Sequence, residues 1–486
     1  MMYLSRAATI LNAQLLGRDV LFNGVSTDSR TLAAGDLFIA LQGDHFDGAG
    51  FVSTAAQAGA VAALVNLSSY QMAEKNVQVA EKNARADDSA SLVQSTIPLL
   101  LVNDTKLALG GLAAHWRAQF PLPLVAVTGS NGKTTVKEML ASILRASTNS
   151  ATAGSTDAVL ATHGNLNNDI GMPLTLLKLR AKHRYAVIEM GMNHTGEIDY
   201  LSRIARPDVA IVNNAGSAHL AGLGSIAAVA RAKGEIFSGL SVQGTAVINA
   251  DDKYASLWRE LVGDKKIIDF ALDHPAAVTA QWQMLEYGAN MDVRTPQGNF
   301  SVQLQVPGAH NVRNALAAIA AAVALNIANA DIAAGLENFL GVAGRMQRHV
   351  TAHGAQLIDD SYNANPASLR AALRVLTQAT GKKILVLGDM GELGAEAAEL
   401  HGHLGAEARE LGIDELLALG ELTRHTVREF GAGAQHFTSI EDLLAALDKK
   451  LHADTTLLIK GSRFMQMERV VKHCTAANEV LEGKHK

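Results

Sequence analysis

Hydrophobic residues along the chain gather in short apolar runs that alternate with stretches in which apolar residues recur at helical spacing. The run LVAVT, at 124–128, is followed by a glycine-rich turn and by VKEMLASILRA, whose apolar positions fit one face of a helix. The later runs AVIEM, DVAIVNN and TAVINA are also separated by helical stretches. This alternation predicts a mostly parallel sheet covered by helices.

The same pattern divides the chain into three α/β units. Residues 1–102 mix short apolar runs with the turn-rich GDHFDGAG and predict a small N-terminal α/β domain. Residues 103–343 predict the central parallel-sheet domain, with an antiparallel addition at 277–306 and a long helix at NVRNALAAIAAAVAL. Residues 344–486 contain AQLID, KILVLGD, ELLALG and TLLIKG between helices, which predicts a Rossmann-like doubly wound domain. No G-x-G-x-x-G follows these strands, so a dinucleotide site there is not supported.

One segment does not fit the alternating pattern. Residues 66–96 are polar, run from NLSSYQ through KNARADDSASLVQST, and show no strong periodicity. We expect an exposed insertion without a direct functional role.

Composition narrows the class of protein. The 486 residues are 48% hydrophobic and 18% charged, which is typical of a globular enzyme of two or three domains. The net charge of -5 argues against extended nucleic-acid binding, although a local phosphate site remains compatible with it. Cys474 is the only cysteine, so neither an intramolecular disulfide nor a cysteine zinc cluster can form. No signal peptide or membrane span is evident, and we expect a cytoplasmic protein without integral membrane contact.

A phosphate-binding loop is the strongest single motif. It lies between the predicted strand and helix and consists of Gly129, Ser130, Asn131, Gly132, Lys133, Thr134 and Thr135. Glycines let backbone N–H groups approach phosphate oxygens, and the helix N-terminus adds a positive dipole. Lys133 offers a charge for the outer phosphates, and the Thr134 hydroxyl can ligate Mg²⁺. The alternative is an ordinary strand-to-helix turn, which the flanking elements make much less favourable.

Glu189 is a second candidate. It ends the strand AVIEM, and a carboxylate at a strand end near the loop can hold Mg²⁺ that bridges ATP phosphates. A solvated glutamate at a strand end explains the local sequence equally well.

The loop also departs from the general pattern, because Val127 stands where that pattern has its first glycine. The shortened form resembles that of the Mur ligases and folylpolyglutamate synthases. Further segments, in order, are similar to those of the Mur ligase family: STDSR, GDLFIALQGDHFDG, GNLNNDIGMPLTLL, VIEMGMNHTGEI, AKGEIF, PGAHNVRNALAA, GRMQRH and DDSYNANPASL. They span nearly the whole chain. The NLNN, MNHTGEI and SYNANP segments most resemble the branch that adds a dipeptide, and the D-N-P-R element of the branch that adds a diamino acid is absent.

The resemblance implies an ATP-dependent ligase with three domains. Residues 1–102 would bind a UDP-muramoyl peptide, 103–343 would bind ATP, and 344–486 would bind the incoming dipeptide and close over ATP. The expected reaction joins D-Ala-D-Ala to the peptide carboxylate of UDP-N-acetylmuramoyl-tripeptide through an acyl phosphate. It would give the pentapeptide precursor of peptidoglycan, ADP and phosphate. We expect a monomer.

The resemblance also assigns residues. His219 and a carbamylated Lys233 would belong to a second metal site, beside Thr134 and Glu189 at the first. The UDP-muramoyl site would be lined by Ser26, Thr27, Asp28, Ser29 and Arg30, with Asn165, Asn167 and Asn168 near the peptide and phosphates. Adenine would contact His310, Asn311 and Asn314, while Arg345 and Asp360 would reach ATP from the last domain. Asn363, Asn365 and Arg463, in the turn Gly461-Ser462-Arg463, are the candidate dipeptide contacts. Taken singly, many of these residue types serve turns, caps or surfaces.

Two other functions remain open at this point. One is a different ligase of the same mechanism, either the diamino-acid branch or a folylpolyglutamate synthase. The other is a nucleotide-binding switch without ligase turnover, in which Glu189, His219 and Lys233 would have no joint role.

Overall fold

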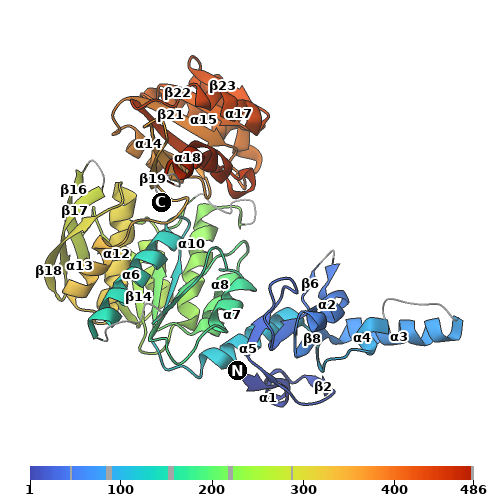
Figure 1. Ribbon diagram of the computed structural model, residues 1–486. Helices are drawn as coiled ribbons and strands as arrows, with labels where there is room; N and C mark the ends of the chain where they lie inside the picture. Colours follow the sequence, from blue (N-terminus) through green and yellow to red (C-terminus); the bar gives the residue numbers. More distant parts are fainter. Residues whose placement is uncertain (44–45, 84–89, 152–157, 217–222, 286–287, 483–486) are drawn as a thin grey trace.

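The computed structural model describes residues 1–43, 46–83, 90–151, 158–216, 223–285 and 288–482. Figure 1 shows three α/β blocks that follow one another along the sequence, with the central block between the first and the last. Each block is built on its own sheet, of five, nine and six strands respectively. The prediction of three α/β domains is therefore confirmed.

The first block is a small sheet with helices beside it. Its strand order is β2 (Gln14–Leu16), β9 (Leu99–Val102), β8 (Ala62–Asn66), β5 (Asp36–Ile39) and β4 (Gly24–Ser26), of which only the β2–β9 pair is antiparallel. The remaining short elements are β1 (Met2–Tyr3), β3 (Leu21–Phe22), β6 (Gln42–Gly43), β7 (Phe46–Asp47), η1 (Gly48–Phe51), α1 (Leu4–Leu11) and α2 (Val52–Gln57). Apolar side chains fill both faces of β8, as expected for a central parallel strand.

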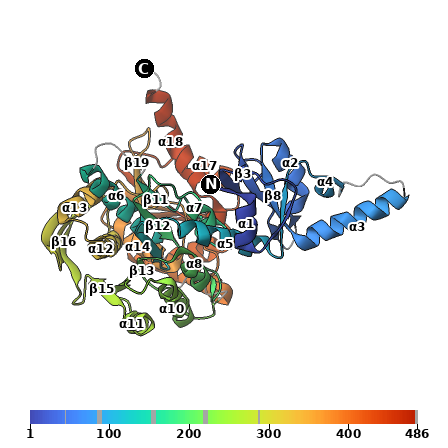
Figure 2. The ribbon, with the colours of Figure 1, turned by 90° about the horizontal axis from the view of Figure 1, so that it is seen from below.

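The polar insertion contains helices that its weak periodicity did not predict. Helix α3 (Leu67–Asn83) is 17 residues long, and α4 (Ala90–Val93) follows it. Both views show α3 projecting from the first block, away from the rest of the molecule (Figures 1 and 2). Because a projecting helix has little core to face, no apolar stripe is required, and its glutamate, lysine, glutamine and alanine residues have good helix propensity.

The central block is a nine-stranded sheet. Its strand order is β11 (Val159–Ala161), β12 (Tyr185–Glu189), β10 (Leu124–Thr128), β13 (Val209–Val212), β14 (Thr245–Asn249), β15 (Lys266–Ala271), β16 (Val278–Leu285), β17 (Gly288–Thr295) and β18 (Gly298–Leu304). The strands from β11 to β16 pair in parallel, whereas β16, β17 and β18 are antiparallel. The predicted parallel sheet and its antiparallel addition are both confirmed.

Helices cover the two faces of this sheet. They are α6 (Lys133–Ala151), α7 (Gly171–Leu176), α8 (Glu197–Ala205), α10 (Ile226–Gly234), η2 (Glu235–Gly239), α11 (Ala255–Val262), α12 (Ala309–Ala324) and α13 (Asn329–Glu337). Helix α12 is the predicted alanine-rich helix, and most of its residues are buried because small side chains let it lie deep in the core. Helix α5 (Thr105–Arg117) packs against α1 of the first block and α7 of the central block.

The last block carries a six-stranded sheet in the order β19 (Gln347–Val350), β20 (Gln356–Asp360), β24 (Thr455–Lys460), β21 (Lys382–Gly388), β22 (Glu415–Leu419) and β23 (Ala434–Phe437). Only the β19–β20 pair is antiparallel. The helical elements are α14 (Pro366–Leu376), η3 (Gly394–Glu396), α15 (Ala397–Glu410), α16 (Thr423–Phe430), α17 (Ile440–Asp448), η4 (Arg463–Met465) and α18 (Glu468–Glu482). Because the carboxyl ends of parallel strands meet at one edge, β20 and β24 bring Asp360 and Lys460 side by side.

Within the described ranges, no helix combines the length and the hydropathy that a bilayer span requires.

We predict that Gly335→Ala destabilises the central block. Helix α13 crosses α6 so closely at Gly335 that an added Cβ would lie 2.3 Å from the Ile143 Cα atom. A backbone atom cannot yield as a side chain can, so the free energy of unfolding should fall by about 1–3 kcal/mol. The matched control is Gly111→Ala in α5, where the new methyl group meets only a leucine methyl group at 3.3 Å. Denaturant unfolding should show no loss for the control, and equal stability of the two variants would contradict the close crossing.

Candidate active site

The phosphate loop has the shape that anion binding requires. It connects β10 to α6, and Gly132 has a φ angle of +79°, which favours glycine. An added Cβ at Gly132 would lie 2.3 Å from the Asn314 Oδ1 atom, so a larger residue has no room. The loop therefore brings Gly132, Lys133 and the N-terminus of α6 to one cavity.

Asparagine side chains hold the loop in this shape. The Asn131 N–H donates to the Asn214 Oδ1 atom at 2.9 Å, and the Asn131 carbonyl accepts hydrogen bonds from the Nδ2 atoms of Asn213 and Asn214, each at 3.0 Å. Asn213 Nδ2 also donates to Asn314 Oδ1 at 2.9 Å. Asn213 and Asn214 were not predicted. Their signal was a polar pair directly after the buried strand DVAIV, at the edge where the loop also lies.

Lys133 begins α6 and turns back over the loop. Its Nζ atom donates to the Gly129 carbonyl at 2.7 Å. Burial lowers the pKa of Lys133, an effect that Glu189 opposes and Arg345 reinforces. Glu189 belongs to the central block and Arg345 to the last block, so charges of both blocks act on Lys133.

Glu189 ends β12 and is 2% exposed. Its Oε2 atom accepts a hydrogen bond from the Thr134 hydroxyl at 2.8 Å, and its Oε1 atom accepts one from Asn167 Nδ2 at 2.8 Å. A buried carboxylate needs such donors or a cation. A hydroxyl and a carboxylate in contact beside a phosphate loop are the oxygen ligands that Mg²⁺ prefers, so these residues fit the ion that the motif implies.

Lys233 lies on α10 and is 1% exposed. Burial holds its pKa well below the usual range, and the charge of Lys133 lowers it further. The predicted partner His219 lies outside the described residues. Within the described ranges, no cluster of three His, Cys, Asp or Glu residues that could hold a metal is found.

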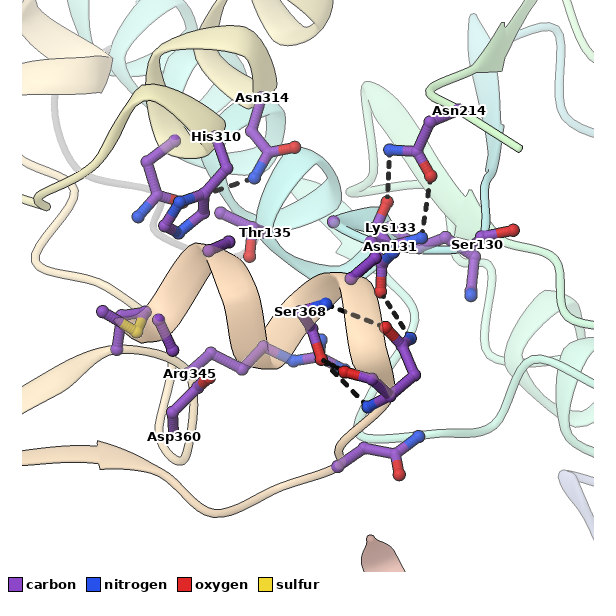
Figure 3. Close-up of a pocket in the computed structure, with 18 of the residues that line it drawn as sticks. Ser130, Asn131, Lys133, Thr135, Asn214, His310, Asn314, Arg345, Asp360 and Ser368 are labelled. Carbon is purple, nitrogen blue, oxygen red and sulfur yellow. Dashed lines mark hydrogen bonds between the residues drawn. The ribbon is translucent and has the colours of Figure 1, made fainter. Parts of the chain in front are cut away.

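A cavity of about 310 Å³, here called the loop cavity, lies between the phosphate loop, α12 and the last block. Figure 3 shows Arg345 and Asp360 facing the loop from one side and His310 and Asn314 from the other. Its walls include the predicted residues Ser130, Asn131, Gly132, Lys133, Thr135, His310, Asn311, Asn314, Arg345, Asp360, Asn363 and Asn365. Gly129 and Thr134 do not line it, although they belong to the same loop.

The loop cavity also contains Lys460, which was not predicted. It is 2% exposed, forms an ion pair with Asp360 and donates to the Asn363 carbonyl at 2.9 Å. The sequence signal was a lysine that ends the otherwise apolar run TLLIK. A buried lysine of this kind is rare unless it is paired.

A second cavity of about 620 Å³, here called the cleft, opens on the other side of Lys133. It brings together the predicted residues Ser130, Lys133, Asn165, Asn167, Asn168, Glu189, Arg345, Asn363, Asn365 and Arg463. Tyr362, Glu392 and Phe464 line it as well and were not predicted. They lie on loops that only the tertiary structure brings to Lys133.

Two of the predicted asparagines bind the backbone where a helix begins. Asn168 Oδ1 accepts from the N–H of Gly171, the first residue of α7, at 2.8 Å. Asn365 Oδ1 accepts from the Ser368 N–H at 2.9 Å in a capping box, while its Nδ2 atom donates to Asn131 Oδ1 at 2.8 Å. This last hydrogen bond joins the last block to the phosphate loop.

The segment Ser26–Arg30 lines neither cavity. It follows β4 in the first block, where Arg30 forms two hydrogen bonds to the Asp28 carboxylate, at 2.9 and 2.7 Å. These hydrogen bonds lower the pKa of Asp28 to about 2. Ser26 Oγ donates to the Asp28 carbonyl at 3.0 Å, which closes the turn. The role of the segment Ser26–Arg30 in binding a UDP-sugar, including the roles of Thr27 and Ser29, stays a prediction.

Three family matches cover most of the chain. Residues 21–117 match the catalytic domain of the Mur ligase family, residues 127–322 match the Mur ligase middle domain, and residues 344–463 match the glutamate ligase domain of Mur ligases.

Curated proteins and solved structures agree with these matches. The UDP-N-acetylmuramoyl-tripeptide--D-alanyl-D-alanine ligase of Escherichia coli K12 is 41% identical and covers 96% of this chain and 97% of its own. The Bacillus subtilis ligase of the same name is 34% identical over 96% of this chain and 95% of its own. A crystal structure of MurF from Acinetobacter baumannii superposes with a TM-score of 0.83, 37% identity and coverage of 96% and 97%. The structure of MurF from Thermotoga maritima in complex with ADP superposes with a TM-score of 0.76 at 26% identity. It covers 93% of this chain and 97% of its own.

The neutral state of His310 gives a testable pH dependence. Burial lowers its pKa to about 4, although Asp360 opposes the shift, whereas the unfolded chain titrates near 6.5. Between these pH values the unfolded state binds more protons, so the stabilisation is present above pH 6.5 and is lost as the pH falls toward 4. The free energy of unfolding of the wild type relative to His310→Gln should therefore decrease over this range in urea unfolding. A difference that is constant with pH would contradict a neutral imidazole at this position.

Proposed function

Because this chain belongs to the Mur ligase family, we propose that it is an ATP-dependent ligase that joins D-Ala-D-Ala to the peptide carboxylate of UDP-N-acetylmuramoyl-tripeptide. The names of relatives that match nearly the whole chain support these substrates. The products are the pentapeptide precursor of peptidoglycan, ADP and phosphate. The observation that carries the proposal is that Lys133 lines both the loop cavity and the cleft, so a nucleotide phosphate and an acceptor can meet there.

The reaction proceeds in two steps. A carboxylate oxygen of the tripeptide attacks the γ-phosphorus, the bond to the β,γ-bridging oxygen breaks, and ADP leaves an acyl phosphate behind. The dipeptide amine then attacks the acyl carbon, the C–N bond forms, phosphate leaves and the amine loses its proton to solvent. No covalent bond to the protein is required, so the protein contributes positioning and charge stabilisation, with Lys133 and Arg345 beside the transferred phosphoryl group.

Two Mg²⁺ sites belong to the proposal. Thr134 and Glu189 hold the first, and Lys233 with His219 belongs to the second. A bound ion supplies positive charge to the ATP phosphates. Lys233 is proposed to be carbamylated: burial keeps its amine neutral, the amine nitrogen adds to CO₂, and loss of one proton leaves an anionic carbamate. That change replaces a buried cation by an oxygen ligand for the metal.

The remaining assignments follow the three blocks. Residues 1–102, with Ser26–Arg30, bind the UDP-muramoyl peptide, residues 103–343 bind ATP, and residues 344–486 bind the dipeptide. His310, Asn311 and Asn314 contact adenine, and Arg345 with Asp360 reaches ATP. Asn165, Asn167 and Asn168 serve the acceptor peptide and phosphates, and Asn363, Asn365 and Arg463 serve the dipeptide. The lining of the two cavities supports these assignments, with the exception of the UDP-muramoyl site in residues 1–102.

Location and assembly complete the proposal. A substrate pair of ATP and a UDP-linked precursor supports a cytoplasmic reaction. The residues assigned to adenine, the acceptor peptide and the dipeptide line one or the other of the two cavities within a single chain, which supports a monomeric enzyme.

The deciding experiment measures phosphate release from ATP with UDP-N-acetylmuramoyl-tripeptide, with and without D-Ala-D-Ala, together with the product mass. Release that depends on the dipeptide and a matching mass gain are expected. Phosphate release only with another amino donor would assign the chain to a different ligase branch. No phosphate release would favour a nucleotide-binding switch.

We predict that Lys133→Ala lowers kcat by about 100- to 1,000-fold, because one positive charge beside the transferred phosphoryl group is lost. Affinity for the UDP-substrate, measured by calorimetry, should stay near the wild-type value, since the first block is untouched. The control is Lys253→Ala, which removes an exposed lysine of the central block. Near-normal turnover of Lys133→Ala would refute the role of Lys133.

Carbamylation of Lys233 can be tested directly. Protein equilibrated with ¹³C-bicarbonate should show a carbamate resonance in the ¹³C spectrum that is absent from Lys233→Arg, because the guanidinium stays protonated. Removal of CO₂ should lower turnover, and bicarbonate should restore it in the wild type only. A spectrum without the resonance, or with the same resonance in both proteins, would count against the modification.

A further inference from the structure

Three segments of the last block converge at one edge of its sheet. Strands β20 and β24 pair in parallel with Asp360 opposite Lys460, so the residues that follow them leave the sheet together. Tyr362 follows β20 and Arg463 follows β24. Strand β19 runs antiparallel to β20 with Gln347 opposite Asp359, so Arg345, just before β19, lies at the same edge.

The Tyr362 ring contacts both arginines. The Cζ atom of Arg345 lies 4.4 Å from the ring centroid, and that of Arg463 lies 5.6 Å from it. Both distances are within the range of a cation–π interaction. Arg463 is held a second time by Glu468, whose Oε1 atom accepts from Nη1 at 2.8 Å.

The backbone fixes Tyr362 relative to both arginine segments. Its N–H donates to the Gly344 carbonyl at 3.1 Å, next to Arg345. Gly344 has a φ of +71°, and an added Cβ there would lie 3.1 Å from the Tyr362 Cβ atom. On the other side, Ser462 Oγ donates to the Ala364 carbonyl at 3.2 Å, next to Arg463. The backbone segment that carries Tyr362 is therefore held on two sides, next to Arg345 and next to Arg463.

This ring stands where the two cavities meet. Tyr362 and Arg345 line both the loop cavity and the cleft, whereas Arg463 lines the cleft. Two guanidinium groups that must each bind an anion repel one another when neither ligand is present. A carboxylate between them would compete with those ligands for the arginines. An aromatic face attracts both cations without accepting their N–H groups, so the donors of Arg463 that Glu468 does not use, and those of Arg345, can bind anions.

We infer that Tyr362 is a positioning residue that holds Arg345 and Arg463 at a fixed separation. The ATP phosphates at Arg345 and the dipeptide carboxylate at Arg463 are then held at a fixed distance from each other. The inference rests on the proposed function, because that function supplies the two anionic ligands.

The test compares Tyr362→Leu with Tyr362→Phe, which keeps the aromatic face. For Tyr362→Leu we expect the KM values for ATP and for D-Ala-D-Ala to rise about three- to tenfold each, as expected for loss of a cation–π contact. The KM for the UDP-substrate should not change, and Tyr362→Phe should restore the wild-type pattern of KM values. If Tyr362→Leu does not fold, Tyr362→Met takes its place.

A matched control separates positioning from general loss of structure. Tyr254→Leu removes another ring, which Lys253 contacts at 4.9 Å outside both cavities, and should leave all three KM values unchanged. A fall in kcat without a split among the KM values of Tyr362→Leu would overturn the inference. So would a Tyr362→Phe variant as impaired as Tyr362→Leu, because the phenolic hydroxyl would then be responsible.

Two further measurements keep this inference distinct from the proposed function. In an Arg463→Gln background, Tyr362→Leu should add little to the KM for D-Ala-D-Ala, and an undiminished further rise would overturn the inference. If the wild type releases no phosphate, the proposed function fails, yet affinity for the ATP analogue AMP-PNP still tests the Arg345 contact. Weaker binding by Tyr362→Leu, restored in Tyr362→Phe, would support that contact, and unchanged binding would overturn it.

Discussion

The fixed backbone of the phosphate loop is the constraint on which the rest of the site depends. Asn131 is held through its N–H, its carbonyl and its side chain by Asn214, Asn213 and Asn365. Asn213 and Asn214 directly follow the central strand β13, and Asn365 is the N-cap of α14 in the last block. The same hydrogen bonds therefore shape the phosphate loop and join two domains, which places the loop cavity at their boundary.

Positive charge is concentrated around the loop cavity. Lys133, Arg345 and Lys460 line the loop cavity, and burial lowers the pKa of Lys133 and of Lys233, on which the charge of Lys133 also acts. The cleft has carboxylates of its own, Asp169, Glu189, Glu197 and Glu392, but in the loop cavity Asp360 alone among the described lining residues offsets this charge. Such an arrangement is costly without anions, and it favours the phosphates, carboxylates and acyl phosphate of the proposed reaction. The Tyr362 ring and the carbamate proposed at Lys233 relieve the repulsion in two different ways.

Topology explains why loops so far apart in sequence meet. The carboxyl ends of parallel strands lie at one edge of a sheet, and both the central and the last sheet turn that edge toward the same cavities. Polar residues thus stand where the apolar core ends: Glu189 is the last residue of β12, Asn213 follows β13, and Lys460 is the last residue of β24. The same strand order therefore determines which apolar residues pack in the core and which polar residues meet in the site.

The sequence by itself determined the three α/β units, the phosphate loop and the family, because periodicity, glycine placement and ordered motifs are local properties of the chain. With the family resemblance, it also singled out just under half of the residues that line each cavity. Only the tertiary structure decided that Asn213 and Asn214 hold the loop, that Lys460 pairs with Asp360, and that Tyr362 contacts two arginines. These facts depend on which strand ends lie side by side, and such neighbours are distant in sequence. Helix α3 was not predicted because it projects from the domain and buries no apolar face. Its sequence therefore lacks the hydrophobic periodicity from which a helix is predicted.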